Sequence, residues 1–151
     1  MYWSNKTRAA LRLAYSLHEG QTDKAGIPYI FHPYRVAECM EKYSKKDVER
    51  LTIVALLHDC IEDTTLDLSG LKEIAVDFDL IIDELTLSAI DSVTRRSDEK
   101  YTDFILRAKQ NEFGRWVKLE DVRDNLNRKR LGTRSPLSKR YKDALDELNK
   151  D

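Results

Sequence analysis

The most chemically distinctive stretch of the chain is LTIVALLHDCIEDTT, residues 51–65. Its apolar first half predicts a buried helix, and its second half carries the ionisable side chains of His58, Asp59, Glu62 and Asp63. An aspartate in a protein interior needs a partner, because an unpaired buried charge is very costly. A divalent metal ion would bind imidazole and carboxylate together. The alternative is a buried hydrogen bond between histidine and aspartate that only fixes the core.

A helix that continued through this stretch would turn all of these side chains toward one cavity. Glu62 would lie one turn beyond His58, and Asp63 one turn beyond Asp59. An adjacent His-Asp pair is a weak signal by itself, so further ligands have to come from other parts of the chain.

Two distant positions can supply such ligands. His32 precedes Pro33, and proline is favoured at the first position of a helix, so His32 is expected at the helix N-cap, where it can face a cavity. Asp121 lies one turn after Val117 on or beside an apolar face, and Asn125 follows one turn later. An N–H···O pair across two helices is the alternative explanation for this buried polar pair.

Together, His32, His58, Asp59 and Asp121 provide two imidazoles and two carboxylates. This donor set suits a divalent ion such as Mn²⁺, Fe²⁺ or Zn²⁺ better than Ca²⁺, which prefers oxygen ligands. Four protein ligands on a six-coordinate ion would leave positions for water and substrate. The ion would make water a nucleophile near neutral pH and would neutralise phosphate charge.

Helices must position these residues, because no stretch of the chain shows a convincing period of two. Ser4 is a good N-cap for the first helix, and Asp79 is a candidate cap for the fifth. Helical spacing predicts helices at residues 5–18, 33–43, 46–60, 68–77, 80–94, 99–109 and 115–131, followed by a last helix that Ser135 and Pro136 open. The expected fold is all-α, a bundle of about seven to eight helices in a single domain over residues 1–151.

Bulk properties restrict the partners and the compartment. A net charge of −1, from 26 basic and 27 acidic residues, gives no basic field for nucleic acid or a membrane surface. No apolar run approaches the roughly 20 residues of a membrane span. The N-terminal MYWSNKTRAA has no apolar signal core, so a cytoplasmic location is expected, with Cys39 and Cys60 reduced. The sequence gives no oligomeric state.

Three segments carry a resemblance to a known family. They are HEGQTDKAGIPYIFHP (18–33), ALLHDCIEDT (55–64) and VKLEDVRDN (117–125). In this order and spacing, the chain resembles the HD-domain metal-dependent phosphohydrolases. It is most similar to the hydrolase domain of the bifunctional RelA/SpoT alarmone enzymes and to their small stand-alone relatives. The resemblance spans roughly residues 8–130.

The resemblance implies a metal site and its ion. Residue by residue, it makes His32, His58, Asp59 and Asp121 the metal ligands. The ion is usually Mn²⁺ in this family, with Fe²⁺, Zn²⁺ or Mg²⁺ as alternatives.

The resemblance also implies a reaction and a substrate. Glu62 and Asp63 match the family's acidic pair, which activates the water and handles the proton, and Lys24 and Asn125 match positions that contact the nucleotide. The implied reaction removes the 3′-pyrophosphate from guanosine tetra- or pentaphosphate. Alarmone synthesis is not expected, because 151 residues are too few for the synthetase domain as well.

Two positions depart from the alarmone enzymes. Asp23 stands before Lys24 where those enzymes commonly have arginine, and an acidic residue is unfavourable near a polyanion unless it points away. Arg128 replaces a small polar residue near the expected base site. These changes favour a second hypothesis, the same chemistry on another nucleotide or small phosphate ester. A third hypothesis is a non-catalytic binding or regulatory module, against which the complete ligand set argues.

Overall fold

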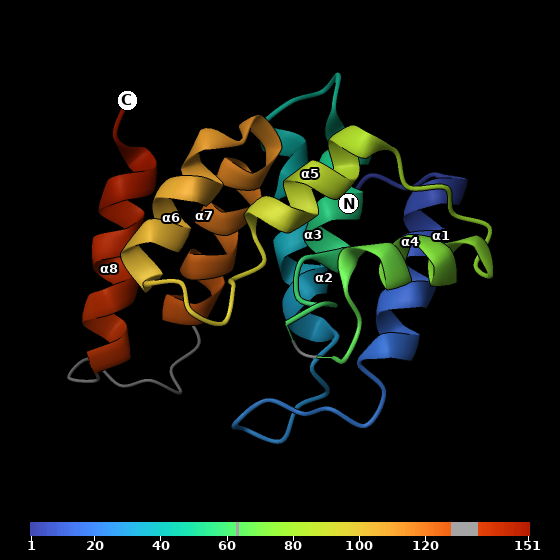
Figure 1. The fold of residues 1–151 in the computed structure, drawn as a ribbon, viewed down its shortest axis with the longest axis horizontal. Helices are drawn as coiled ribbons and strands as arrows, with labels where there is room; N and C mark the ends of the chain where they lie inside the picture. The colour runs from blue at the N-terminus through green and yellow to red at the C-terminus, as the bar shows by residue number, and fades with distance from the viewer. Residues whose placement is uncertain (63, 128–135) are drawn as a thin grey trace.

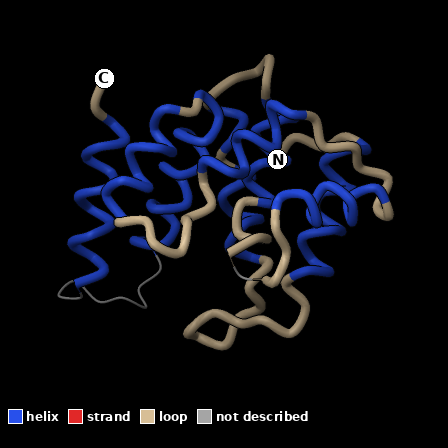
Figure 2. Tube along the Cα trace, in the orientation of Figure 1, coloured by secondary structure: helices blue, strands red, loops and turns tan. Residues whose placement is uncertain are grey.

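The computed structural model describes residues 1–62, 64–127 and 136–151 (Figure 1). Within these ranges the chain is helical, and its sole β feature is an isolated bridge between Thr22 and Pro28 (Figure 2). The prediction of an all-α fold is therefore confirmed. The described elements are α1 (Asn5–Leu17), α2 (Phe31–Glu38), the short 3-10 helix η1 (Met40–Lys42), α3 (Val48–Leu57), α4 (Leu68–Val76), α5 (Glu84–Ser92), α6 (Tyr101–Gln110), α7 (Glu112–Asn127) and α8 (Pro136–Asn149).

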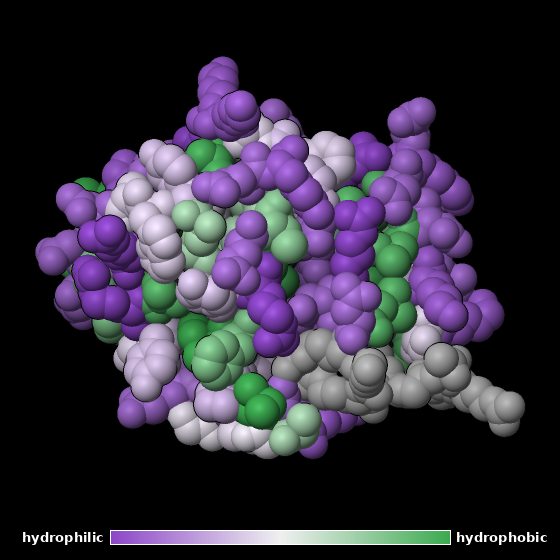
Figure 3. Space-filling view, turned by 180° about the vertical axis from the view of Figure 1, so that it is seen from behind, coloured by the Kyte–Doolittle hydropathy of each residue, from purple (hydrophilic) through white to green (hydrophobic). Residues whose placement is uncertain are grey.

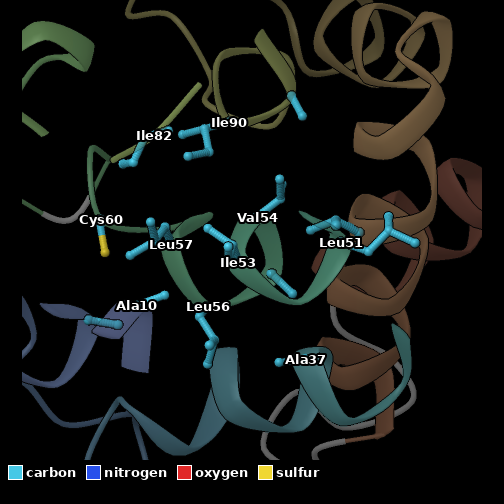
Figure 4. Close-up of a cluster of buried hydrophobic side chains, with 14 of the residues drawn as sticks. Ala10, Ala37, Leu51, Ile53, Val54, Leu56, Leu57, Cys60, Ile82 and Ile90 are labelled. Atoms are coloured by element: carbon cyan, nitrogen blue, oxygen red, sulfur yellow. The ribbon is translucent and has the colours of Figure 1, made fainter. Parts of the chain in front are cut away.

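Helix α3 is the centre of the larger core. All of its residues except Glu49 and Arg50 are buried, as its apolar sequence predicts. It packs against α1, α2, α5 and α7. Figure 4 shows this arrangement through apolar side chains that surround the helix, among them Ala10 of α1, Ala37 of α2 and Ile90 of α5. The last turn of α3 thus ends inside the protein, where it delivers His58.

A second, smaller core lies between α6, α7 and α8, which stand together on one side of the molecule (Figure 1). Its buried members are Ile105, Leu119, Val122, Ala144 and Leu148. Tyr43 and Trp116 pack against both cores, and their rings stack with centroids 4.9 Å apart. Helix α7 therefore connects the two halves of the helical assembly.

The end of α3 differs from the prediction. The helix stops at Leu57 instead of continuing to Cys60, and His58 is its C-cap. The His58 Nδ1–H donates to the Ala55 carbonyl at 2.6 Å, and a continuing helix would need that carbonyl for the N–H of Asp59. Glu62 therefore lies on a turn and not one helical turn beyond His58.

The start of α2 also differs. The helix begins at Phe31, so His32 lies in its first turn and the prediction of His32 as N-cap is wrong. A preceding turn leads directly into the helix, because the His32 N–H donates to the Tyr29 carbonyl at 3.0 Å. Pro33 is tolerated in the first turn, where backbone N–H groups have no helical partner. The predicted continuation to residue 43 becomes the separate η1.

Helix starts elsewhere follow side-chain caps. The predicted Ser4 cap is confirmed, with a reciprocal capping box to Thr7. Helix α5 begins at Glu84 instead of residue 80, because Asp79 has a positive φ of 60° and Asp83 is the residue that caps the helix. The predicted end of the α7 region, residues 128–131, and the Ser135 cap lie outside the described residues.

The face of the molecule in Figure 3 is largely hydrophilic, with apolar side chains gathered between the hydrophilic ones. Among the described helices, none is long and apolar enough to cross a membrane.

Candidate metal centre

One ring nitrogen of His58 makes no hydrogen bond, although carboxylate oxygens lie near it. His58 is buried at the end of α3, and its Nδ1–H donates to the main-chain carbonyl of Ala55. A carbonyl can only accept, so Nδ1 must carry the hydrogen and the neutral ring has its lone pair on Nε2. That Nε2 is buried without a hydrogen-bond partner in the described part of the chain. Such an atom calls for a ligand, because unpaired buried polar groups are rare.

His32 is oriented by a carboxylate from another helix. Its Nδ1 lies 2.6 Å from Oδ2 of Asp124 on α7, while its Nε2 lies 2.9 Å from Oδ1 of Asp121. Asp124 is held in turn by Arg35, whose Nε and Nη2 donate to it at 2.7 and 3.0 Å. A carboxylate behind a histidine fixes the ring and its tautomer, as in many metal sites.

The four predicted ligands come together in space although they lie on separate segments. His32, His58 and Asp121 each offer a ligand atom within 4.8 Å of the others. Oδ2 of Asp59 joins them, at 3.1 Å from Nε2 of His58 and 3.4 Å from Nε2 of His32. The folding of α2, α3 and α7 therefore produces the expected cluster of two imidazoles and two carboxylates.

The charges within this cluster are strongly coupled. Burial works to lower the pKa of His58, but the negative charges of Asp59 and Asp121 overcome it and raise that pKa well above its usual value. Burial works to raise the pKa of Asp121, but the Lys118 ammonium and the imidazoles bring it well below its usual value. The charge of His58 likewise overcomes the effect of burial and lowers the pKa of Asp59. Both carboxylates are therefore ionised at neutral pH, and they attract positive charge.

These residues fit a divalent metal ion. In the neutral ring, Nε2 of His58 has a lone pair that an ion can bind in place of a proton, and ionised carboxylate oxygens lie 3.1 and 3.5 Å from it. A mixed nitrogen and oxygen donor set suits first-row transition metals.

Three further side chains hold the two carboxylates in place. The Tyr29 hydroxyl donates to Asp59 Oδ2 at 2.6 Å, and the Lys118 ammonium donates to Asp121 Oδ2 at 2.7 Å. The Asn125 amide donates to Asp121 Oδ1 at 3.2 Å. This N–H···O pair lies within α7, whereas the pair across two helices is the one between Nε2 of His32 and Oδ1 of Asp121, at 2.9 Å. A contact of Asn125 with substrate stays a prediction.

Glu62 lies at the rim of the site with an exposed side chain whose carboxyl is partly enclosed. It accepts a hydrogen bond from the backbone N–H of Arg95, on the segment between α5 and α6. Enclosure raises the pKa of Glu62 and the charge of Asp59 adds to it, while the Arg95 hydrogen bond opposes both. Asp63, the second predicted catalytic carboxylate, lies outside the described residues.

The loop between α1 and α2 carries Lys24, which is exposed. Asp23 beside it folds back on its own loop, since its carboxylate accepts the N–H groups of Ala25 at 2.7 Å and Ile27 at 3.1 Å. The negative charge of Asp23 is therefore partly satisfied by main-chain dipoles. Arg128, the other departure from the alarmone enzymes, lies outside the described ranges.

Sequence reasoning missed the residues that support the ligands: Tyr29, Arg35, Lys118 and Asp124. A usable signal was present on α7, because Asp124 follows Asp121 by three positions and so shares its face. The partner of Asp124 could not be read from spacing, since His32 is 92 positions away.

Comparisons with known proteins identify a family and several relatives by sequence. A family described as HD domain matches residues 10–123. The guanosine-3′,5′-bis(diphosphate) 3′-pyrophosphohydrolase of Borreliella burgdorferi is 40% identical over 89 residues, which are 59% of this chain and 12% of that protein. The bifunctional (p)ppGpp synthase/hydrolase SpoT of Escherichia coli K12 is 44% identical over 69 residues, 46% of this chain and 10% of that protein. A Vibrio cholerae protein with the same name as the first is 37% identical over 98 residues, 62% of this chain and 13% of that protein. The chain thus matches only a small part of each relative's length.

Proposed function

The chain belongs to the HD domain family, and from this we propose that it is a metal-dependent phosphohydrolase. The observation that carries the proposal is the cluster of His32, His58, Asp59 and Asp121, with its unpaired buried nitrogen. We propose these four residues as the ligands of one divalent ion, with Mn²⁺ as the leading candidate.

The residues around the cluster hold the four proposed ligands in the orientation that an ion would need. When bound, a divalent ion makes water more acidic and draws negative charge from a phosphate group. Asp124 and Arg35 keep Nε2 of His32 directed at the ion site, because they occupy the opposite side of the ring. Tyr29 and Lys118 fix the carboxylates of Asp59 and Asp121 in the same way.

Glu62 is the proposed general base. Its raised pKa brings the carboxyl closer to neutral pH, where an acid or base transfers protons most effectively. Glu62 would take the proton of the attacking water at a carboxylate oxygen, while the Arg95 N–H keeps the group in place. Asp63 is the proposed partner in this proton transfer.

The substrate we propose is guanosine 3′,5′-bis(diphosphate), from which the enzyme would remove the 3′-pyrophosphate. The names of the matched relatives support this choice, and the bonds that the Asp23 carboxylate makes within its own loop weaken the objection that this residue raises. Lys24 and Asn125 are the proposed nucleotide contacts, from the α1–α2 loop and from α7.

A different small nucleotide or phosphate ester is the second candidate. Asp23 favours it, because this carboxylate still puts a negative charge next to Lys24, where a polyanion would have to approach. A non-catalytic module is disfavoured, because a site without catalysis has no need of every ligand together with Glu62.

The test is the release of phosphate and pyrophosphate from a panel of nucleotides, measured with Mn²⁺ and with chelator. Mn²⁺-dependent pyrophosphate release from guanosine bis(diphosphate) alone is the expected result. Release from another nucleotide instead would support the proposed metal-dependent hydrolysis and contradict the proposed substrate. No metal-dependent hydrolysis of any member at high enzyme concentration would refute the proposed activity.

A further inference from the structure

An open apolar groove lies along α1, and the proposed mechanism does not use it. The groove has a volume of about 690 Å³, and its walls come from α1, from the start of α2 and from the segment that follows α4. Its apolar and aromatic lining residues are Leu11, Tyr15, Ile30, Phe31, Tyr34 and Phe78. In Figure 3, green and pale side chains gather in the left half of the view, where α1 and α2 lie.

Two aromatic side chains of this groove are open to solvent. Tyr15 is 61% exposed, and Phe31 is 48% exposed. One exposed apolar residue is ordinary, but monomeric soluble proteins rarely expose several together around one groove. Aromatic side chains are enriched in the centres of protein–protein interfaces, where they contribute much of the binding energy. The groove therefore has the character of a protein interface.

The charged residues of the groove have opposite signs and lie on either side of Tyr15. Arg12 and Glu19 both line the groove, seven positions apart, which is about two helical turns. Both side chains are exposed, and within the described ranges neither forms an ion pair. Two charges that cancel do not select a partner of one sign, so the partner should carry both signs at the same spacing.

A second copy of the chain carries both signs at this spacing. If the α1 helices of two copies lie antiparallel, a two-fold axis beside Tyr15 places Arg12 opposite Glu19 of the partner subunit. The same axis places Glu19 opposite Arg12 of the partner subunit, so both ion pairs form together. Parallel helices would instead place arginine beside arginine and glutamate beside glutamate, which is unfavourable.

We propose that this groove binds a second copy of the chain, through a two-fold contact in which the two α1 helices are antiparallel. Tyr15 of each copy packs into the groove of the other, and the two pairs of Arg12 with Glu19 fix the register. Phe31, which lines the groove, directly precedes the buried His32 in the first turn of α2. The dimer contact therefore packs on the turn that carries a proposed metal ligand.

Sedimentation velocity at several protein concentrations tests the contact, and a reversible dimer is expected for the wild type. Tyr15→Ala removes the exposed ring, whereas Arg12→Glu and Glu19→Arg each place like charges opposite one another. Each of these variants is expected to raise the Kd of the dimer about tenfold or more. Lys6→Glu is the matched control, because Lys6 is an exposed residue of α1 that lines a different pocket, and its Kd should equal that of the wild type.

A mixture of the two charge variants tests the antiparallel pairing itself. Arg12→Glu and Glu19→Arg each repel a copy of themselves, but a dimer with one copy of each pairs opposite charges at both contacts. The mixture should therefore form a one-to-one dimer with about the Kd of the wild type. The double variant with both substitutions should recover the same Kd, because its charges are again complementary.

Three results would overturn the proposal, after circular dichroism has shown that the variants are folded. A wild type that is monomeric at every concentration excludes a second copy as the occupant, whatever other protein then binds the groove. Equal Kd values for Tyr15→Ala, Arg12→Glu and Lys6→Glu would place the dimer contact on another surface. Charge variants that fail to associate with each other, although the wild type forms a dimer, would exclude the antiparallel pairing. None of these measurements depends on hydrolase activity.

Discussion

At the scale of single residues, the two histidines of the cluster are oriented by different means. His58 donates to the main-chain carbonyl of Ala55, whereas His32 donates to the carboxylate of Asp124, which Arg35 holds from α2. Both arrangements place the hydrogen on Nδ1 and direct Nε2 at the same point. If His32 is a ligand as proposed, the metal affinity of the site depends on Asp124, which is not itself among the proposed ligands.

Asp124→Asn should weaken Mn²⁺ binding. The neutral amide no longer fixes the tautomer of His32, and it gives the ring no negative charge to pair with. Loss of such a supporting carboxylate typically lowers metal affinity by about 10- to 100-fold. Calorimetric titration with Mn²⁺ measures the effect, and Asp143→Asn on the exposed face of α8 is the matched control. Equal Mn²⁺ affinity in Asp124→Asn and the wild type would show that the carboxylate has no supporting role.

Glu62→Gln should separate binding from catalysis. The variant is expected to keep the Mn²⁺ affinity of the wild type and to lose about 100- to 10,000-fold in kcat, because the amide cannot accept the proton of water. Asp121→Ala is the contrast, since it removes a proposed ligand and should lower Mn²⁺ affinity. Turnover by Glu62→Gln at the wild-type rate would exclude Glu62 as the base.

The sequence alone identified the side chains that meet, but not how they are supported. A buried apolar run that ends in His58 and Asp59 predicts a partner for the charge, and the structure provides one in this cluster. Tyr29 and Asp124 were not predicted, because each finds its partner through the tertiary fold, 30 and 92 positions away. Local spacing contains no information about such pairs.

At the scale of elements, the existence of helices was more predictable than their ends. The apolar period located α3, but its last turn depends on the side chain of His58, which takes the Ala55 carbonyl. Helix α5 begins late for a similar local reason, because Asp83 and not Asp79 accepts the N–H of Thr86. The spacing of apolar residues predicts which face of a helix is buried. The residue at which the helix begins depends on which side chain caps it.

The segment between α5 and α6 positions the Arg95 N–H that binds Glu62, and α6 holds this segment in place. Arg107 on α6 donates to the carbonyls of Asp91 and Thr94, both at 2.7 Å, and to the carboxylate of Glu99 at 2.9 Å.

Acid should weaken the hydrogen bonds of Arg107 with Glu99, because the Glu99 carboxylate becomes protonated. The hydrogen bonds from Arg107 lower the pKa of Glu99 from its usual 4.5 to about 2 in the folded protein. A lowered folded-state pKa gives stability that is present above the unfolded-state value and is lost as the pH falls toward the folded-state value. Glu99→Gln should therefore make the free energy of unfolding less dependent on pH between about 4.5 and 2. Urea denaturation at several pH values measures this, and an unchanged pH slope would contradict the assignment.

At the scale of the whole molecule, two apolar cores share α7 and the stacked rings of Tyr43 and Trp116. The all-α class followed from the sequence, because no segment alternates with a period of two. The division of the core did not, since it depends on which helix faces meet. We propose that the described helices form one domain and unfold together, because the same side chains stabilise both cores.

Trp116→Ala should lower the stability of both cores at once. The ring is partly buried, so we expect a loss of about 2–4 kcal/mol in the free energy of unfolding, near the lower part of the range for large core residues. Calorimetry should give one transition in the wild type, with equal calorimetric and van't Hoff enthalpies. Trp3→Ala, at an exposed position, is the control. Two separate wild-type transitions would show that the cores are independent.

The hydrogen bond from His58 to the Ala55 carbonyl has a consequence for how the site can change in evolution. Every amino acid carries a carbonyl, so no single substitution at position 55 deletes this acceptor. His32 has no such protection, since one nucleotide change can remove the carboxylate of Asp124. The orientation of His58 is thus insensitive to a substitution at the residue that supports it, whereas the orientation of His32 is sensitive to one. Drift in metal preference among descendants of this chain would therefore begin on the side of His32.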